Sequence, residues 1–293
     1  MELVKKSNEE MQKENKFSAY TWRERQKMPK QPRDYVFNTC PAGKLGMLTG
    51  KQDMGKSFLA LEIAVSVALG QDITGGAIVV TKSGKVLYLS LEDDLVEMDR
   101  RLETMLEYVK VASESDDYLD NIVVAESNTI LSLINQAGKA NDDAIAELHA
   151  LAKDMRLVII DTVAKSHLGD ENSTSMTILM QIYADLAKQQ GCAVLLIHHP
   201  GKGGGNHVRG HSSLLDVRYR IVLKHNKNGN GFVLCNEKNN YGPREKTIEL
   251  HKNRTNGVFL LKNANNMMKA KTERKETEEV EEKNIETGMV TKW

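Results

Sequence analysis

Cysteine is scarce in this sequence, and the three cysteines, Cys40, Cys192 and Cys235, show no CxxC spacing. The pattern excludes a disulfide framework, and two of the cysteines lie in apolar runs where cysteine acts as a small hydrophobic residue. No apolar run is as long as a membrane span, and the polar N-terminal segment has no signal-peptide core. We therefore expect a cytoplasmic protein with no membrane partner.

The sequence also lacks net charge and aromatic side chains. Lys and Arg together number 40, as do Asp and Glu, so the formal net charge is zero. No global field then attracts nucleic acid or an anionic membrane, and any nucleic-acid contact must be a local patch. Aromatic residues make up only 5% of the chain, which disfavours a general single-strand binder that stacks bases on rings.

Apolar residues are sufficient for a large core, since 40% of the 293 residues are hydrophobic. Residues 1–31 are polar without a periodic apolar face, and we expect a flexible N-terminal arm. Residues 263–293 are rich in Lys and Glu, and we expect a charged, disordered C-terminal tail. The folded domain is therefore expected to span residues 32–262.

The most specific motif matches the phosphate-loop pattern G-x-x-x-x-G-K-[ST] at every fixed position. Glycines at both ends let the backbone approach a polyphosphate, and the loop N–H groups and the helix N-terminus attract it. In this pattern Lys56 reaches the β- and γ-phosphates, and the Ser57 hydroxyl ligates Mg²⁺. An ordinary glycine-rich turn is the alternative. The residues expected to bind a nucleotide are Gly50, Lys51, Gln52, Asp53, Met54, Gly55, Lys56, Ser57 and the adjoining Phe58.

The segments around this loop favour the nucleotide site. Residues 44–49 predict a short strand, and residues 57–69 predict a helix that is apolar nearly all round, interrupted only by Glu62 and Ser66. Such a helix must be buried, and Gly70 is a natural stop for it. A strand, a loop and a buried helix in this order are the context that the motif requires.

An acidic run follows the next predicted strand, at residues 85–91. In an open α/β sheet, ligands bind at the carboxyl ends of the strands. Glu92 is the first polar residue past this strand, so it is placed to orient, or take a proton from, a water that attacks the γ-phosphate. The alternative is that all three acids cap the following helix, which is the role expected for Asp93 and Asp94.

A second acidic residue ends another apolar strand, at residues 157–160, which a predicted helix at 141–155 precedes. Asp161 follows this strand directly. Phosphate-loop enzymes need such an acid near the Mg²⁺ shell, usually acting through water. We expect Ser57 and Asp161 to hold the metal, and the strand of Asp161 to lie beside the loop strand.

Two imidazoles, His198 and His199, end the strand predicted at 192–197. At the active edge of the sheet they could hydrogen-bond a γ-phosphate and report its presence. Zinc binding is the alternative, disfavoured because no Cys or acidic ligand stands at metal spacing nearby. A capping role stays open for one of the pair. The glycine-rich, basic loop at 200–211 suits contact with a phosphate backbone and an ordinary surface loop equally well.

The C-terminal third of the chain changes to short strands at 218–224, 231–237, 246–251 and 258–262. Turns at 226–231 and 253–257 are of the kind that join antiparallel hairpins. The expected fold class is α/β, with a mostly parallel central sheet flanked by helices and extended by C-terminal antiparallel β-hairpins.

This order of motifs resembles the RecA-like P-loop ATPase core, in which a glutamate on the neighbouring strand acts as the base. Over residues 35–262 the chain is still more similar to the RepA-type hexameric replicative helicases of plasmids and phages. Three of the similar segments are the phosphate loop, LYLSLED, which ends at Asp93, and IIDT, which ends at Thr162. The others are His167 with Asp170-Glu171-Asn172, the pair His198-His199, RGHSSLLD, which begins at Arg209, and Lys238-x-Asn240-Tyr241-Gly242.

The resemblance implies that ATP and Mg²⁺ lie between subunits of a hexameric ring, with an arginine finger from the neighbour. Carried over, the finger is Arg218, because Tyr219 follows it as an aromatic follows the arginine of the family motif. The segment before Arg218 departs from the family spacing, so Arg220 is a rival. Lys238 would be a second cation acting across the interface.

The predicted function is an ATP-hydrolysing ring ATPase, a replicative DNA helicase of a plasmid, phage or integrated element that translocates on single-stranded DNA. Loops at 164–175 and 200–211 would face the channel, and initiation or loading proteins would be further partners. The alternatives are a RecA-like, DNA-stimulated ATPase in recombination, defence or regulation that unwinds no strands, and a nucleotide-binding assembly protein without a motor role.

Overall fold

The computed structural model describes residues 18–110, 116–126, 132–168, 174–199, 217–229, 231–243 and 247–262. This part of the chain divides into two units, one ending at Arg33 and the other beginning at Asp34. The first contains helix α2 (Trp22–Lys27), which begins with a capping box between Thr21 and Glu24. The tail predicted at 263–293 and the loop at 200–211 lie outside the described residues.

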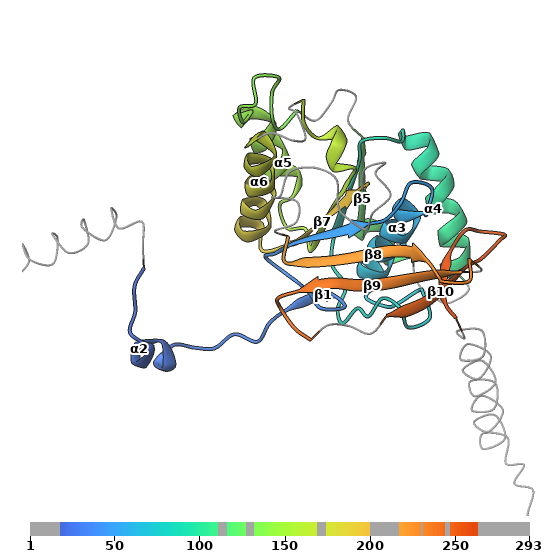
Figure 1. Cartoon of the computed structure of the whole chain (residues 1–293), viewed down its shortest axis with the longest axis horizontal. Coiled ribbons are helices and arrows are strands. Elements are labelled where there is room, and N and C mark those ends of the chain that lie inside the picture. The colour runs from blue at the N-terminus through green and yellow to red at the C-terminus, as the bar shows by residue number, and fades with distance from the viewer. Residues whose placement is uncertain are drawn as a thin grey trace, which may run out of the picture. The chain divides into compact units, whose positions relative to one another are not determined.

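The second unit is built on a large, mostly parallel sheet with helices on both faces (Figure 1). The strands of this sheet are β3 (Leu45–Thr49), β4 (Val86–Ser90), β5 (Ile122–Glu126), β6 (Leu157–Asp161), β7 (Ala193–His198), β8 (Tyr219–His225), β9 (Phe232–Asn239), β10 (Ile248–Lys252) and β11 (Phe259–Leu261). The short strands β1 (Tyr35–Phe37) and β2 (Cys40–Pro41) form a separate antiparallel pair. The helices are α3 (Lys56–Leu69), α4 (Leu95–Lys110), α5 (Asp142–Leu151) and α6 (Thr174–Gln190), with single turns at Asp117–Asn121 and Val163–Lys165.

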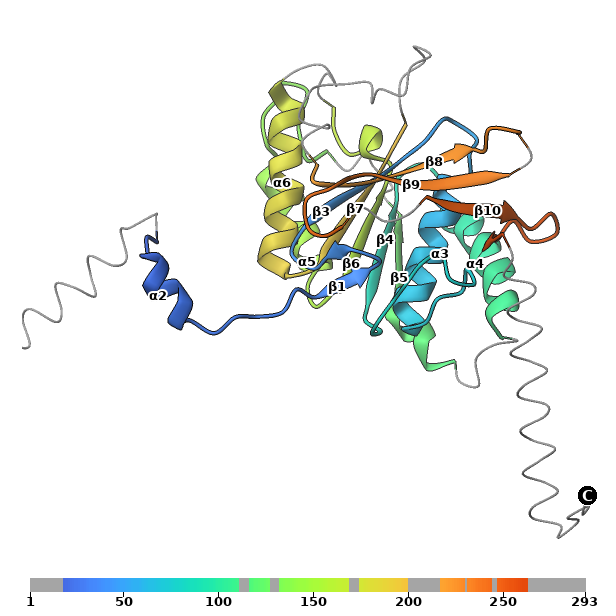
Figure 2. The same ribbon diagram turned by 60° about the horizontal axis from the view of Figure 1, so that its bottom comes forward.

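The parallel strands are buried on both faces, which explains why they read as continuous apolar runs. Successive side chains of β3 show this, since Met47 belongs to the core with α5 and α6, whereas Leu48 belongs to the core with α3 and α4. Figure 2 shows the two helix pairs on opposite sides of the sheet. The predicted α/β class, with a parallel centre and antiparallel C-terminal strands, is confirmed.

The strand order corrects one prediction. In the described residues it is β11-β10-β9-β8-β3-β7-β6-β4-β5, so β7 lies between the loop strand β3 and the strand of Asp161, β6. The expectation that these two strands are neighbours was therefore wrong. Asp161 still reaches the loop because α3 packs across the sheet against β6 and β4, which brings its first turn over the ends of those strands.

Helix α3 is buried as predicted, and its two polar interruptions have partners. The Glu62 carboxylate accepts the N–H of Phe259 at 2.7 Å, and the Ser66 hydroxyl accepts the N–H of Ile73 at 3.3 Å. Gly70 ends the helix with φ of 77°, a left-handed conformation in which glycine carries no steric cost. Both polar interruptions within the helix therefore anchor neighbouring segments.

The antiparallel extension also has the predicted hairpins, with β8 paired to β9 and β10 paired to β11. Its strands begin and end one or two residues away from the predicted bounds, and β8 starts at Tyr219 rather than Arg218. Across the described residues, no helix combines the length and the apolar character that crossing a membrane would require.

Candidate nucleotide site

The loop from Gly50 to Ser57 joins β3 to α3 at the carboxyl edge of the sheet, where open α/β sheets bind ligands. A Cβ at Gly50 would lie 2.6 Å from the carbonyl oxygen of Leu223 in β8. At Gly55, φ is +84° and a Cβ would lie 3.0 Å from the Phe259 ring. Both fixed glycines of the motif are therefore required by close packing against the antiparallel strands, in addition to any ligand.

Lys56 is the first residue of α3, and only 3% of it is exposed. Its ammonium donates a hydrogen bond to the carbonyl oxygen of Lys51, at 2.8 Å, within the loop. Burial lowers the pKa of Lys56 to about 8, against the opposing charges of Asp161, Glu92 and Asp53. A bound anion would favour the charged form of Lys56. This contact between the lysine and a phosphate is the interaction that the motif predicts.

Asp161 lies beneath the same helix turn and is 4% exposed. The Tyr88 hydroxyl donates a hydrogen bond to Asp161 Oδ2 at 2.5 Å. Burial raises the pKa of Asp161, while the hydroxyls of Tyr88 and Ser57 oppose the shift. These contacts bring Asp161 and Ser57 together, although their strands are not adjacent.

Tyr88 is a site residue that the sequence reasoning missed. It occupies the middle of the apolar strand β4, and its side chain is 1% exposed. A signal was available, because a tyrosine hydroxyl in a strand buried on both faces must find a polar partner. Asp161, at the carboxyl end of the adjacent strand β6, is that partner.

The atoms around Asp161 fit a hydrated magnesium ion. Asp161 Oδ1 is buried, and no residue in the described part of the chain hydrogen-bonds to it. A buried carboxylate oxygen needs a partner, and Mg²⁺ keeps water ligands that would supply one beside the Ser57 hydroxyl. For the zinc alternative, the described residues hold no group of three or more His, Cys, Asp or Glu placed to hold a metal ion.

Glu92 and His199 face each other at the open side of the site. Glu92 Oε1 accepts a hydrogen bond from the Thr162 hydroxyl at 3.2 Å, and Glu92 Oε2 lies 4.0 Å from His199 Nε2. Burial and the charge of Lys56 lower the pKa of His199, so the neutral imidazole is favoured near neutral pH. His198 is different, being 3% exposed and part of β7, opposite Thr49 of the loop strand.

The two acids after Glu92 have different roles. Asp94 is the predicted cap of α4, because its Oδ1 accepts the N–H of Glu97 at 2.8 Å. Asp93 instead pairs with Arg101, with an N–O distance of 2.6 Å. The expected capping role of Asp93 was therefore wrong, since a guanidinium two turns along α4 competes for the carboxylate.

Of the two candidate arginines, Arg218 lies at the opposite edge of the sheet from the loop. Arg218 immediately precedes β8, whose parallel register with β3 begins at Gly46 opposite Tyr219. From there to Gly50 the strand advances by roughly 13 Å. Arg220 lies opposite Met47 in the middle of β3, and Lys238 of β9 is its partner in the register. None of these cations therefore lies at the loop of its own chain.

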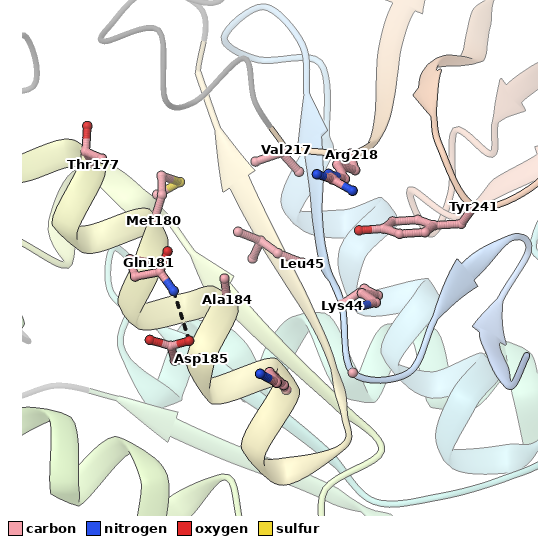
Figure 3. A pocket seen from close by; sticks show the side chains of 12 residues that line it. Lys44, Leu45, Thr177, Met180, Gln181, Ala184, Asp185, Val217, Arg218 and Tyr241 are labelled. Carbon is pink, nitrogen blue, oxygen red and sulfur yellow. Dashed lines mark hydrogen bonds between the residues drawn. The ribbon is translucent and has the colours of Figure 1, made fainter. Parts of the chain in front are cut away.

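Arg218 and Arg220 differ in what surrounds them. Arg220 is bound to Glu237, with an N–O distance of 2.8 Å, and its side chain is only 13% exposed. Arg218 is exposed and lines a cavity of about 500 Å³, which the α6 residues Gln181 and Asp185 also line (Figure 3). Of these two arginines, Arg218 is the one available to a second molecule.

Comparison with known proteins identifies the family and the fold. The family model described as an AAA domain matches residues 11–205 of the chain. The structure is similar to that of a KaiC-like protein from the hyperthermophilic archaeon Pyrococcus horikoshii OT3, with a TM-score of 0.51 and 14% sequence identity. That similarity covers 75% of this chain and 90% of the archaeal chain, and it supports the fold alone. The chain belongs to the AAA domain family and is a RecA-like P-loop ATPase.

Proposed function

We propose that the protein is a ring-forming ATPase that hydrolyses ATP between subunits and acts as a replicative DNA helicase on single-stranded DNA. The observation that carries the proposal is the division of the site between two edges of the sheet. The phosphate loop, Asp161 and Glu92 lie at one edge, whereas Arg218 lies at the other. An arginine so placed can complete a site only in another copy of the chain.

In this mechanism Lys56 and the loop N–H groups hold the phosphates, and Ser57 and Asp161 hold the hydrated Mg²⁺. When bound, Mg²⁺ neutralises charge on the phosphate oxygens. Glu92 orients the attacking water and accepts its proton, with its carboxylate held by the Thr162 hydroxyl. His199, or His198 as its alternative, hydrogen-bonds the γ-phosphate, and Arg218 of the neighbouring copy stabilises charge in the transition state.

The proposed DNA contact uses local charge because the chain has no net charge. The loops at 164–175 and 200–211 would line a channel and grip the phosphate backbone, in a hexamer whose loading uses initiation or loading proteins. The second of these loops follows His199, and the first follows the turn after Asp161. Each loop is therefore joined directly to a residue of the nucleotide site, so a change at the phosphate could move it.

A second candidate is a RecA-like, DNA-stimulated ATPase that acts in recombination, defence or regulation without unwinding. The observation that favours it is the zero net charge together with an aromatic content of 5%. Both are unfavourable for a protein that holds long stretches of separated strand.

The first test measures the ATPase rate with and without single-stranded DNA, and the molecular mass with and without nucleotide. We expect DNA to increase turnover, and nucleotide to favour an oligomer, because Arg218 must come from a second copy. Strand displacement on a forked duplex then separates the helicase from the second candidate. A protein that stays monomeric and whose ATPase ignores DNA would overturn the helicase proposal.

Lys56→Ala should abolish nucleotide binding. The substitution removes the buried cation that reaches the phosphates, and binding of a fluorescent ATP analogue measures the loss. Lys82→Ala is the matched control, because Lys82 lies outside the loop and its ammonium pairs with Asp34 on the surface. Wild-type affinity in Lys56→Ala would contradict the assignment of the phosphate site.

Glu92→Gln should bind ATP with near wild-type affinity and fail to hydrolyse it. The amide keeps the shape of the side chain and can still accept from Thr162, but it cannot take a proton. We expect kcat to fall by about 10²-fold or more while nucleotide affinity is retained. Turnover at the wild-type rate would show that another group is the base.

Arg218→Ala should lower kcat by roughly 10³-fold without loss of ATP binding. Mixing it with Lys56→Ala should restore activity, because some interfaces then combine an intact loop with an intact arginine. Arg220→Ala is the control, and its effect should be on stability through the lost Glu237 pair. If Arg220→Ala loses hydrolysis and Arg218→Ala does not, the two assignments must be exchanged.

A further inference from the structure

The hairpin formed by β10 and β11 lies against the outer side of the phosphate loop. Strand β10 runs in the same direction as β3, since β9 is antiparallel to both β8 and β10, so β10 ends at the loop edge. Its turn contacts the start of α3, where a Cβ at Gly257 would lie 3.3 Å from the Phe58 ring. Figure 2 shows β10 on the side of the sheet that carries α3 and α4.

Lys252, the last residue of β10, places a cation beside this loop. Its Nζ lies 5.1 Å from the centroid of the Phe58 ring and 5.6 Å from that of Phe259. The same nitrogen is 3.4 Å from the point that a Cβ of Gly55 would occupy. Within the described residues, no carboxylate forms an ion pair with Lys252, so its contacts here are with aromatic faces and the loop backbone.

The neighbouring charged groups leave the charge of Lys252 available. Arg101 also lies over Phe58, at 5.7 Å from the centroid, but it is paired with Asp93 and Glu97. Glu62 is fully buried, and its Oε1 accepts the N–H of Phe259. Burial raises the pKa of Glu62, while the N–H of Phe259 and the positive charge of Lys252 oppose the shift. The hydrogen bond from Phe259 shows that Glu62 anchors the hairpin that presents Lys252.

The strand order determines whether the γ-phosphate or the ribose end of a bound nucleotide lies near Lys252. Glu92 and His199 follow β4 and β7, on one side of β3, whereas Lys252 ends β10 on the other side. The γ-phosphate must face Glu92 and His199 for the proposed hydrolysis. The other end of the nucleotide then extends toward Phe58 and Lys252, beyond the loop N–H groups that hold the α- and β-phosphates.

We propose that Lys252 is a second nucleotide-binding cation supplied in cis, which contacts the α-phosphate and the ribose end of the bound nucleotide. The inference rests on the proposed ATP site and adds a residue that the phosphate-loop motif does not contain. Phe58 and Phe259 hold the lysine stem and its ammonium in place, and Glu62 fixes the hairpin. Because the α-phosphate is common to ADP and ATP, both nucleotides should depend on Lys252 to the same extent.

The test measures dissociation constants for ADP and for a non-hydrolysable ATP analogue by titration calorimetry on the full chain. Lys252→Met keeps the apolar stem against the rings but removes the charge. We expect it to weaken both nucleotides by about 10-fold, the effect of losing one charged contact. Lys252→Arg should stay within about twofold of wild type, because it keeps the cation.

Lys262→Met is the matched control, since Lys262 follows β11 at the far end of the same hairpin and pairs with Glu249 on the surface. It should leave both affinities unchanged, and all variants should melt at the wild-type temperature without nucleotide. Should Lys252→Met not fold, Lys252→Gln is the second variant, and a reduced salt dependence of ADP binding is expected for it.

Three results would overturn the inference, and the third would also overturn the proposed function. Wild-type affinity in Lys252→Met, with Lys56→Ala unable to bind, would remove Lys252 from the site but leave the ATP site standing. A loss confined to the ATP analogue would place Lys252 at the γ-phosphate end instead. A wild-type protein that binds neither nucleotide would overturn the proposed function itself, and this inference with it.

Discussion

Two opposite charges buried beneath the first turn of α3 are the constraint on which the rest of the site depends. Lys56 and Asp161 are each at least 96% buried, and burial moves the pKa of each toward its neutral form. Removing a charge from water is costly unless it is paired and hydrogen-bonded. The hydrogen bonds of Lys56 to the carbonyl oxygen of Lys51, and of the Tyr88 hydroxyl to Asp161, offset part of this desolvation free energy. An anionic phosphate beside Lys56 and a hydrated cation beside Asp161 would offset the rest.

The same constraint explains why strands from both halves of the sheet pack around the phosphate loop. The carbonyl oxygen of Leu223 leaves no room for a side chain at Gly50, and the Phe259 ring leaves little at Gly55. The antiparallel strands thus support the phosphate loop from outside, while β4 and β6 supply Tyr88 and Asp161 from the other side. A buried carboxylate, Glu62, ties these two halves together through the N–H of Phe259.

Much of this arrangement could be predicted because the governing patterns are local. The phosphate loop, the buried helix after it and the polar residues that end three strands were all identified from short-range spacing. Which strands are neighbours could not be predicted in this way. The apolar run of β7 is as suitable for the place beside β3 as the run of β6, and a pattern of burial carries no information on order. The partner of Asp93 was missed for a related reason, since Arg101 competes from two turns away on α4.

The sequence by itself determined that a phosphate loop opens a buried helix at the edge of a parallel sheet, and that antiparallel hairpins follow, because periodicity and glycine placement act over a few residues. The tertiary structure alone decided that β7 separates β3 from β6, that Tyr88 reaches Asp161, and that Arg218 and Lys252 stand at opposite edges of the sheet. These are distances between segments far apart in the chain. They depend on how α3 and the hairpins pack across the sheet, which no short stretch of sequence encodes.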